Sequence, residues 1–275
     1  MKARIKMGVA ALSVAAAMVV GLGGSSSAAP LRLQAFGITS DGGLMAAFKT
    51  DTPQQLDWVR VPTGLVGDTS LIGLDFRVQN NTLYAVGNRG GIYTVSLNVG
   101  FEATLTKVSQ LTVALSGSNF GVDFNPAADR LRVISDAGQN LRHDLNTNTT
   151  VIDGPLSATG VSAAAYTNND LHPDTATTLF DINTTTDQVV IQSPPNNGSL
   201  AATGSLGVDA GPNAGFDIFS DLSNGKTISN TAFGAFIPSG GSATLYTVEL
   251  LTGAATRVGT FPLAITEVAV SLDSN

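Results

Sequence analysis

The sequence predicts an all-β protein, and more specifically a β-propeller of five four-stranded blades in which the C-terminal strand completes the first blade. Three observations lead to this prediction. Residues 118–154 contain four short strand patterns separated by turn residues, other segments repeat that unit, and no segment has a convincing helical period. One sheet of this size buries too little apolar surface to be stable alone, so the unit needs its copies.

The repeating unit is clearest in residues 118–154. Its predicted strands are NFGVDF, DRLRVIS, QNLRHDL and TTVID, and the residues between them favour tight turns. Similar four-strand patterns occupy residues 71–111, 161–206 and 215–261. Three copies open on a small, apolar, acidic, apolar motif, at 73–76, 121–124 and 215–218, and the copy at 163–166 is degenerate. This period is close to that of known propeller repeats.

The two ends of the chain together supply the remaining blade. Residues 33–63 contain only three strand patterns, and residues 265–271 match the missing first strand. A blade built from both ends closes the ring and leaves no long sheet edge exposed. An open β-sandwich or a six-bladed propeller remains the alternative.

The first segment has the pattern of a secretory signal peptide. A basic stretch with Lys2, Arg4 and Lys6 precedes an apolar run, and small residues follow up to a cleavage position after Ala28. We therefore expect a signal peptide at 1–28 and one propeller domain at 29–275. The protein would be secreted, either extracellular or periplasmic, without a membrane association after cleavage. A retained membrane anchor is the alternative.

Composition excludes several classes of function. The formal net charge is −7 and would be more negative without the basic leader, so the chain should repel nucleic acid. There is no cysteine, which excludes disulfides, thiolate metal sites and cysteine nucleophiles.

Four acidic residues are expected around the central channel, where the innermost strand of each blade runs. Asp75, Asp123 and Asp217 share a strand face with the small residues of their motifs, and Glu267 takes the small-residue position in the closing blade. Four carboxylates around one axis could bind a hard cation such as Ca²⁺. Alternatively, each Asp accepts hydrogen bonds from a neighbouring blade, with no cofactor at all. Without a metal, these acids should raise one another's pKa.

The loops at one face carry polar residues that could contact a ligand. They include Asp41, Asp68, Asn88, Arg89, Asn119, Asp136, Gln139, Asn140, Asp187 and Asn213. Turn formation alone would also explain them. Arg89 is not required by a turn, so Arg89 and Gln139, with Asn88, Asp136 and Asn119, are the predicted ligand-binding residues.

Two short motifs resemble metal sites only weakly. The segment 144–149 has oxygens at the first positions of a calcium loop but lacks its glycine and its bidentate Glu, so a hairpin turn is expected. Asp170, His172 and Asp174 alternate in a loop, where solvation is the simpler interpretation.

Catalytic residues are scarce. His143 and His172 belong to different blades and no Gly-x-Ser-x-Gly motif occurs, which argues against a Ser-His-acid hydrolase. We expect a non-catalytic, monomeric binding module for an extracellular small ligand, glycan or protein. A glycoside-type hydrolase that uses the channel carboxylates, or a structural cell-surface or matrix protein, is the alternative.

Several segments also resemble a known family. LIGLDFRVQNNTLYAVG, FGVDFNPAADRLRVISDAGQNLR, AAAYTNND, TTLFDINTTTDQVVIQSPPNNGSL and GVDAGPNAGFDI are similar to the secreted bacterial domain of unknown function 4394, over about residues 34–261. The resemblance implies a secreted, propeller-like module and no particular reaction. The loop after Tyr166 is shorter than is usual in that family.

Overall fold

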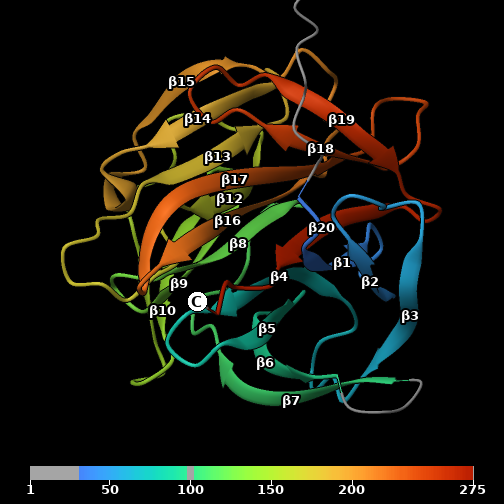
Figure 1. Ribbon diagram of the computed structural model, residues 1–275. Coiled ribbons are helices and arrows are strands. Elements are labelled where there is room, and N and C mark those ends of the chain that lie inside the picture. Colours follow the sequence, from blue (N-terminus) through green and yellow to red (C-terminus); the bar gives the residue numbers. More distant parts are fainter. Residues whose placement is uncertain (1–30, 98–101, 275) are drawn as a thin grey trace, which may run out of the picture.

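The computed structural model describes residues 31–97 and 102–274, and the predicted signal peptide lies outside these residues. Within them the chain forms twenty strands and one short 3₁₀ turn, η1 (Pro195–Asn197). The strands group into five blades of four antiparallel strands arranged around a central axis (Figure 1), and the outer strands of two of these blades join them into one eight-stranded sheet. The predicted five-bladed propeller is therefore confirmed.

Each blade consists of four strands in order from the axis outward. Blade 1 is β20 (Ile265–Val270), β1 (Gln34–Thr39), β2 (Met45–Lys49) and β3 (Leu56–Thr63). Blade 2 is β4 (Leu71–Arg77), β5 (Thr82–Gly87), β6 (Gly91–Ser96) and β7 (Glu102–Gln110). Blade 3 is β8 (Phe120–Asn125), β9 (Arg130–Ser135), β10 (Asn140–Asp144) and β11 (Thr149–Ile152).

Blades 4 and 5 follow the same plan. Blade 4 is β12 (Val161–Tyr166), β13 (Leu179–Asn183), β14 (Gln188–Gln192) and β15 (Leu200–Ser205). Blade 5 is β16 (Gly215–Ser223), β17 (Lys226–Phe236), β18 (Thr244–Val248) and β19 (Ala255–Thr260).

The ring closes through blade 1, as the sequence predicts. Strand β20 pairs antiparallel with β1, and Val268 lies opposite Gly37. The innermost strands β4, β8, β12, β16 and β20 contact one another in sequence, and β20 contacts β4. The two ends of the described chain are thus held in one sheet, and the central axis is enclosed on all sides.

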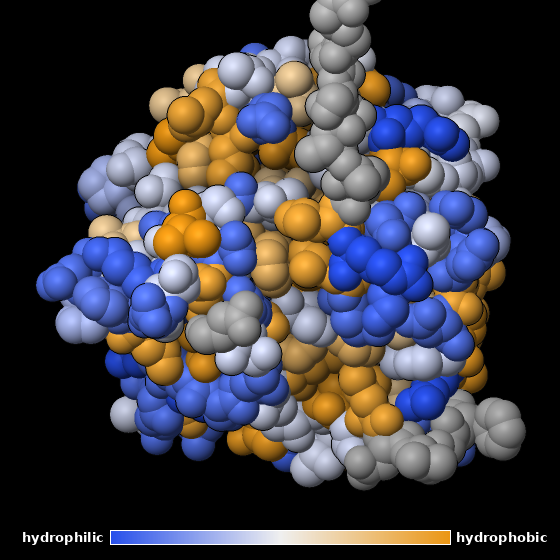
Figure 2. All heavy atoms as spheres, in the orientation of Figure 1, coloured by the Kyte–Doolittle hydropathy of each residue, from blue (hydrophilic) through white to orange (hydrophobic). Residues whose placement is uncertain are grey.

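Hydrophobic side chains between neighbouring blades form the core. The cluster between blades 2 and 3, for example, contains Tyr84, Val122, Phe124 and Leu131, with Tyr84 and Phe124 in edge-to-face contact. Large exposed hydrophobic residues are distributed over all five blades, and the face in Figure 2 shows hydrophobic and hydrophilic residues intermixed. Among the described residues, no helix is long and apolar enough to cross a membrane.

Two features of the fold were not predicted. The outer strands of blades 1 and 2 pair in parallel over three residues, beginning with Val61 opposite Glu102. The hairpin β16–β17 extends beyond the expected strands to a two-residue turn at Asn224 and Gly225, both with positive φ. An Asn-Gly pair favours this type of turn, so the sequence contained the signal.

This long hairpin covers the end of the channel at which the inner strands finish. Asn168, just after β12, and Asn230 exchange two hydrogen bonds of 3.1 and 2.8 Å. Asp170 accepts from the amide and the hydroxyl of Thr227, and Asp273, after β20, accepts from the amide of Leu222 at 2.8 Å. The opposite end of the channel, where the inner strands begin, contains a pocket lined by residues of four blades.

The small residues of the inner strands allow a close approach between blades. A Cβ atom at Gly121 would lie 2.6 Å from the amide nitrogen of Ala164. Backbone cannot yield as a flexible side chain can, so we expect Gly121→Ala to lower the free energy of unfolding by about 1–3 kcal/mol. Urea denaturation measures this change in the free energy of unfolding. Gly241→Ala is the control, because its nearest contact would be 3.2 Å in an external loop, and an equal loss in both variants would contradict the packing argument.

Candidate functional site

Three buried carboxylates meet at the axis of the propeller. One carboxylate oxygen from each of Asp75, Asp123 and Asp217 lies within 4.8 Å of the other two. The residues occupy equivalent positions on β4, β8 and β16, and all three are buried. The structure therefore brings together three of the four predicted channel acids, and we call them the axial aspartates.

The axial aspartates accept hydrogen bonds from backbone amides of the inner strands. Asp75 accepts from Phe124 in the next blade at 2.7 Å and from the adjacent Phe76. Asp123 accepts from Tyr166 in the next blade at 3.1 Å.

Asp217 completes the pattern. It accepts from Val270 in the next blade at 2.5 Å and from the adjacent Ile218 at 2.6 Å. The five donors occupy the same position in the five inner strands. Three carboxylates thus satisfy all five equivalent amides around the ring, although blades 1 and 4 have Ala269 and Ala165 in place of the aspartate.

The electrostatics of the axial aspartates follow from their burial and proximity. Burial, followed by the charge of Asp217, raises the pKa of Asp75 well above its usual value. Burial and then the charges of Asp75 and Asp217 do the same for the pKa of Asp123. Burial raises the pKa of Asp217 to about 6 despite its two amide donors. A neighbouring carboxylate thus contributes to the raised pKa of Asp75 and Asp123, whereas burial alone raises the pKa of Asp217 and Glu267.

A Ca²⁺ site is one of the two alternatives that the sequence leaves for these residues, and it stays a prediction. Three carboxylate oxygens of this spacing are of the type that a hard cation prefers. The same carboxylates already accept backbone hydrogen bonds, which is the alternative that the sequence left open. Glu267 does not belong to this group, because it lies two residues before Ala269, nearer the open end of the channel.

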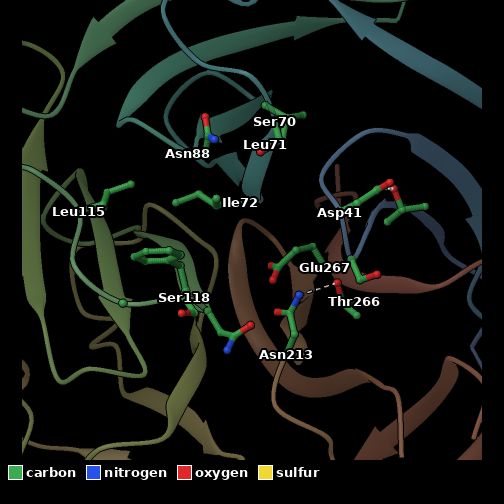
Figure 3. A pocket seen from close by; sticks show the side chains of 15 residues that line it. Asp41, Ser70, Leu71, Ile72, Asn88, Leu115, Ser118, Asn213, Thr266 and Glu267 are labelled. Atoms are coloured by element: carbon green, nitrogen blue, oxygen red, sulfur yellow. Dashed lines mark hydrogen bonds between the residues drawn. The ribbon is translucent and has the colours of Figure 1, made fainter. Parts of the chain in front are cut away.

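The open end of the channel contains a pocket of about 300 Å³ (Figure 3). The loops and first residues of the inner strands of blades 1, 2, 3 and 5 form its wall. The lining residues are 39–41, 70–72, 88, 115, 117–120, 213, 266 and 267. Most are hydroxyl or amide residues, and Ile72, Leu115 and Phe120 add apolar surface. The pocket therefore combines polar groups with a small apolar wall.

Glu267 is the buried charged residue of this pocket. Its side chain extends from β20 into the cavity between Ile72 and Asn213 (Figure 3). The residue is 8% exposed, and burial raises the pKa of its carboxyl well above the usual value. Among the described residues no group donates a hydrogen bond to that carboxylate. Its oxygens are not enclosed, in contrast to both oxygens of the fully buried Asp181 on β13, so they face the cavity and are accessible to a partner that enters it.

The five predicted ligand-binding residues are dispersed. Arg89 donates to the carbonyl of Gly67 at 3.1 Å, and Gln139 bridges Ser116 and Ala114. Neither of the two lines the pocket at the channel mouth. Their polar groups form hydrogen bonds with neighbouring loop backbone.

The other three predicted residues lie nearer the channel. Asn88 and Asn119 line the mouth pocket, whereas Asp136 lines a neighbouring shallow one. Asp136 accepts from the amides of Ser118 and Asn119 and from the Asn119 side chain, and so it positions the loop that borders the pocket. Polar loop residues at this face were a useful signal, but the sequence did not single out Glu267 as a pocket residue.

The weaker metal motifs are occupied by local hydrogen bonds. Asp144 accepts from the amide of Asn146 at 2.8 Å within the expected hairpin turn. Asp170 is committed to Thr227, and the His172 ring accepts from the amide of Asp174 at 3.2 Å. These contacts match the turn and loop interpretations.

A serine and a histidine meet between blades 2 and 3, which the sequence did not predict. Ser109 lies 2.7 Å from Nε2 of the buried His143, and its hydroxyl donates to Asn148 at 2.7 Å. Nε2 must then donate to Ser109, and Nδ1 accepts from Thr150 at 2.9 Å. Burial also lowers the pKa of His143. Since the serine proton points away from the histidine, the pair joins two blades and lacks the arrangement of a nucleophile and base.

Comparisons with known proteins concern the fold. A family model described as a domain of unknown function, DUF4394, matches residues 44–270. No curated protein matches the chain. A chain in the crystal structure of the nidogen/laminin complex is similar with a TM-score of 0.51 at 9% identity, covering 87% of this chain and 98% of that one.

Two further structures show lower similarity. TolB from Acinetobacter baumannii has a TM-score of 0.42 at 12% identity, covering 88% of this chain and 67% of that one. The WD40 domain of Toxoplasma gondii coronin has a TM-score of 0.44 at 13% identity, covering 80% and 55%. The similarity to the chain of the nidogen/laminin complex, at 9% identity, shows the fold alone.

The axial aspartates predict an unusual pH dependence. Their pKa values are higher in the folded state than in the unfolded chain. Their contribution to the free energy of unfolding is therefore fully present below about pH 4. It is lost as the pH rises through the folded-state pKa values, about 6 for Asp217. In EDTA, the free energy of unfolding should fall by up to about 1.4 kcal/mol per pH unit for each proton that the folded state still holds and the unfolded chain has lost. Urea titrations between pH 5 and 8 should show that Asp217→Asn reduces this loss, whereas the exposed Asp174→Asn does not. Identical slopes in all three proteins would contradict the assignment.

Calcium provides a separate test of the same residues. Since backbone amides already satisfy the axial aspartates, we expect the same melting temperature in EDTA and in millimolar CaCl₂ at pH 7.5. A ligand at one hundred times its dissociation constant would add about 2.7 kcal/mol, which is a shift of several degrees for a domain of this size. A rise of that size, absent in Asp75→Asn, would instead establish a cation at the axis.

Proposed function

The chain belongs to the DUF4394 family, whose function is unknown, and from its site we propose that it is a non-catalytic binding module for a small polar ligand. The ligand would occupy the pocket at the mouth of the channel. One observation carries the proposal: four blades build a polar pocket around the Glu267 carboxylate, to which no group of the described residues donates a hydrogen bond.

The size and lining of the pocket suit a ligand of about the dimensions of one sugar ring. A volume of about 300 Å³ is at the small end of the range for ligand sites. Hydroxyl and amide groups such as Ser70 and Asn88 can exchange hydrogen bonds with ligand hydroxyls, and Phe120 offers an apolar surface. This combination supports a small hydroxylated molecule or a terminal glycan residue over a large apolar one.

The geometry gives less support to hydrolysis. The axial aspartates do not line the pocket, and their oxygens accept backbone amides. A glycosidase needs one carboxyl group to protonate the leaving group and another to assist attack on the same bond. Glu267 and Asp41 are the acids of the pocket, and Asp41 is held ionised by the Thr39 hydroxyl and the Gly43 amide, which lower its pKa. Binding therefore requires fewer assumptions than catalysis.

We also propose that the protein meets this ligand outside the cytoplasm, as a monomer. The basic and apolar pattern of residues 1–28 supports export.

A bulky side chain at the rim tests whether the pocket binds a ligand. Ser118 is exposed and lines the pocket, so Ser118→Trp should fill the mouth without disturbing the core. In a panel of neutral, cationic and anionic monosaccharides, saturation-transfer NMR should detect ligands of the wild-type protein that Ser118→Trp binds at least tenfold more weakly. Ser223→Trp, at the hairpin on the opposite face, is the matched control. The proposal fails if no compound binds, or if Ser118→Trp binds every compound as the wild type does.

A further inference from the structure

We propose that the pocket at the channel mouth is selective for ligands that carry a primary ammonium group, with Glu267 as the counter-charge. This inference rests on the proposed function and names the chemical class of its ligand. An amino sugar is the simplest molecule that combines the expected size, hydroxyl groups and charge.

The first argument is the state of Glu267. The residue is 8% exposed, its carboxylate lies in the wall of the cavity, and that carboxylate accepts no hydrogen bond from the described residues (Figure 3). In the same molecule every axial aspartate accepts at least one backbone amide. Burial without a partner disfavours the ionised form, and a bound cation would restore it.

The second argument is the balance of donors and acceptors around the cavity. Asn213 donates its amide hydrogen to Thr266 at 3.1 Å, and Asn119 donates to Asp136 at 2.8 Å. These bonds orient each amide and leave its carbonyl oxygen available to accept, together with its second N–H. With the Glu267 carboxylate, these oxygens are three acceptors from three separate segments of the wall. An ammonium group has three N–H donors and no acceptor, so it complements this set.

The third argument is the charge of the wall. None of the residues that line the pocket is Lys, Arg or His, whereas Asp41 and Glu267 are both acidic. Asp41 uses one oxygen to accept from the Thr39 hydroxyl at 2.6 Å and from the Gly43 amide at 3.0 Å, which leaves its second oxygen available. An anionic ligand would meet repulsion here, and a neutral sugar would leave the buried carboxylate uncompensated.

The test compares two probes of nearly the same shape, D-glucosamine and D-glucose. They differ in having an ammonium group or a hydroxyl group at one carbon. Isothermal titration at pH 7 should show glucosamine binding at least tenfold more tightly, a difference of about 1.4 kcal/mol. Glu267→Gln keeps the size of the side chain and should abolish that preference. Glu249→Gln, which changes an exposed glutamate outside this pocket, should retain it.

A second variant keeps the test valid if Glu267→Gln does not fold. Ser118→Lys places a tethered ammonium group on an exposed rim position. It should occupy the acceptors itself, raise the melting temperature and abolish glucosamine binding. Retention of wild-type glucosamine affinity in Ser118→Lys would contradict the proposal.

The remaining outcomes separate this inference from the proposed function. Equal affinity for glucose and glucosamine, lost in Ser118→Trp, would overturn ammonium selectivity and leave the binding module intact. Glu267-dependent binding of CaCl₂ alone, without glucosamine binding, would assign the pocket to a metal ion and overturn the ammonium class. Glucosamine binding that Glu267→Gln leaves unchanged would overturn the role of Glu267.

Discussion

The fold depends on how five strands can surround one axis with their backbones in close contact. Near the axis there is room for little more than a glycine, yet the amides that face the neighbouring blade need acceptors. The axial aspartates meet both requirements. Each lies two residues after a glycine and accepts a hydrogen bond from a backbone amide of the next blade. Burial raises the pKa of all three carboxyls, the neighbouring carboxylates add to this for Asp75 and Asp123, and the backbone donors offset part of the cost.

Glu267 departs from this pattern in a way that connects the architecture with the proposed function. It occupies the position that is Gly73, Gly121 or Gly215 in other blades, and its side chain has no amide to accept. The departure occurs in the blade assembled from both ends of the chain, at the end of the channel that contains the pocket. If this position served the structure alone, a glycine would fit it better than a glutamate. We therefore regard the axial aspartates as structural and Glu267 as the group that awaits a ligand.

The repeats made the architecture predictable, because the motif of small, apolar and acidic residues recurs at each inner strand and the missing strand of blade 1 could be found at the C-terminus. The sequence also placed the four acids near the axis. It could not separate their roles, because the hydrogen-bond donors of these acids are distant in the chain, such as the Val270 amide that donates to Asp217. For the same reason it did not show that Arg89 donates to the Gly67 carbonyl outside the mouth pocket, or that Ser109 pairs with His143 across two blades.

The most direct test of this division of roles is carboxyl ¹³C NMR of protein labelled at Asp and Glu side chains. Signals of Asp75, Asp123, Asp217 and Glu267 would be assigned by single substitutions and followed during addition of glucosamine. The account predicts that the Glu267 carboxyl resonance moves toward its ionised position while the three aspartate resonances remain within their line widths. Movement of the aspartate signals with an unchanged Glu267 signal would contradict it, and would make the axial carboxylates the ligand site.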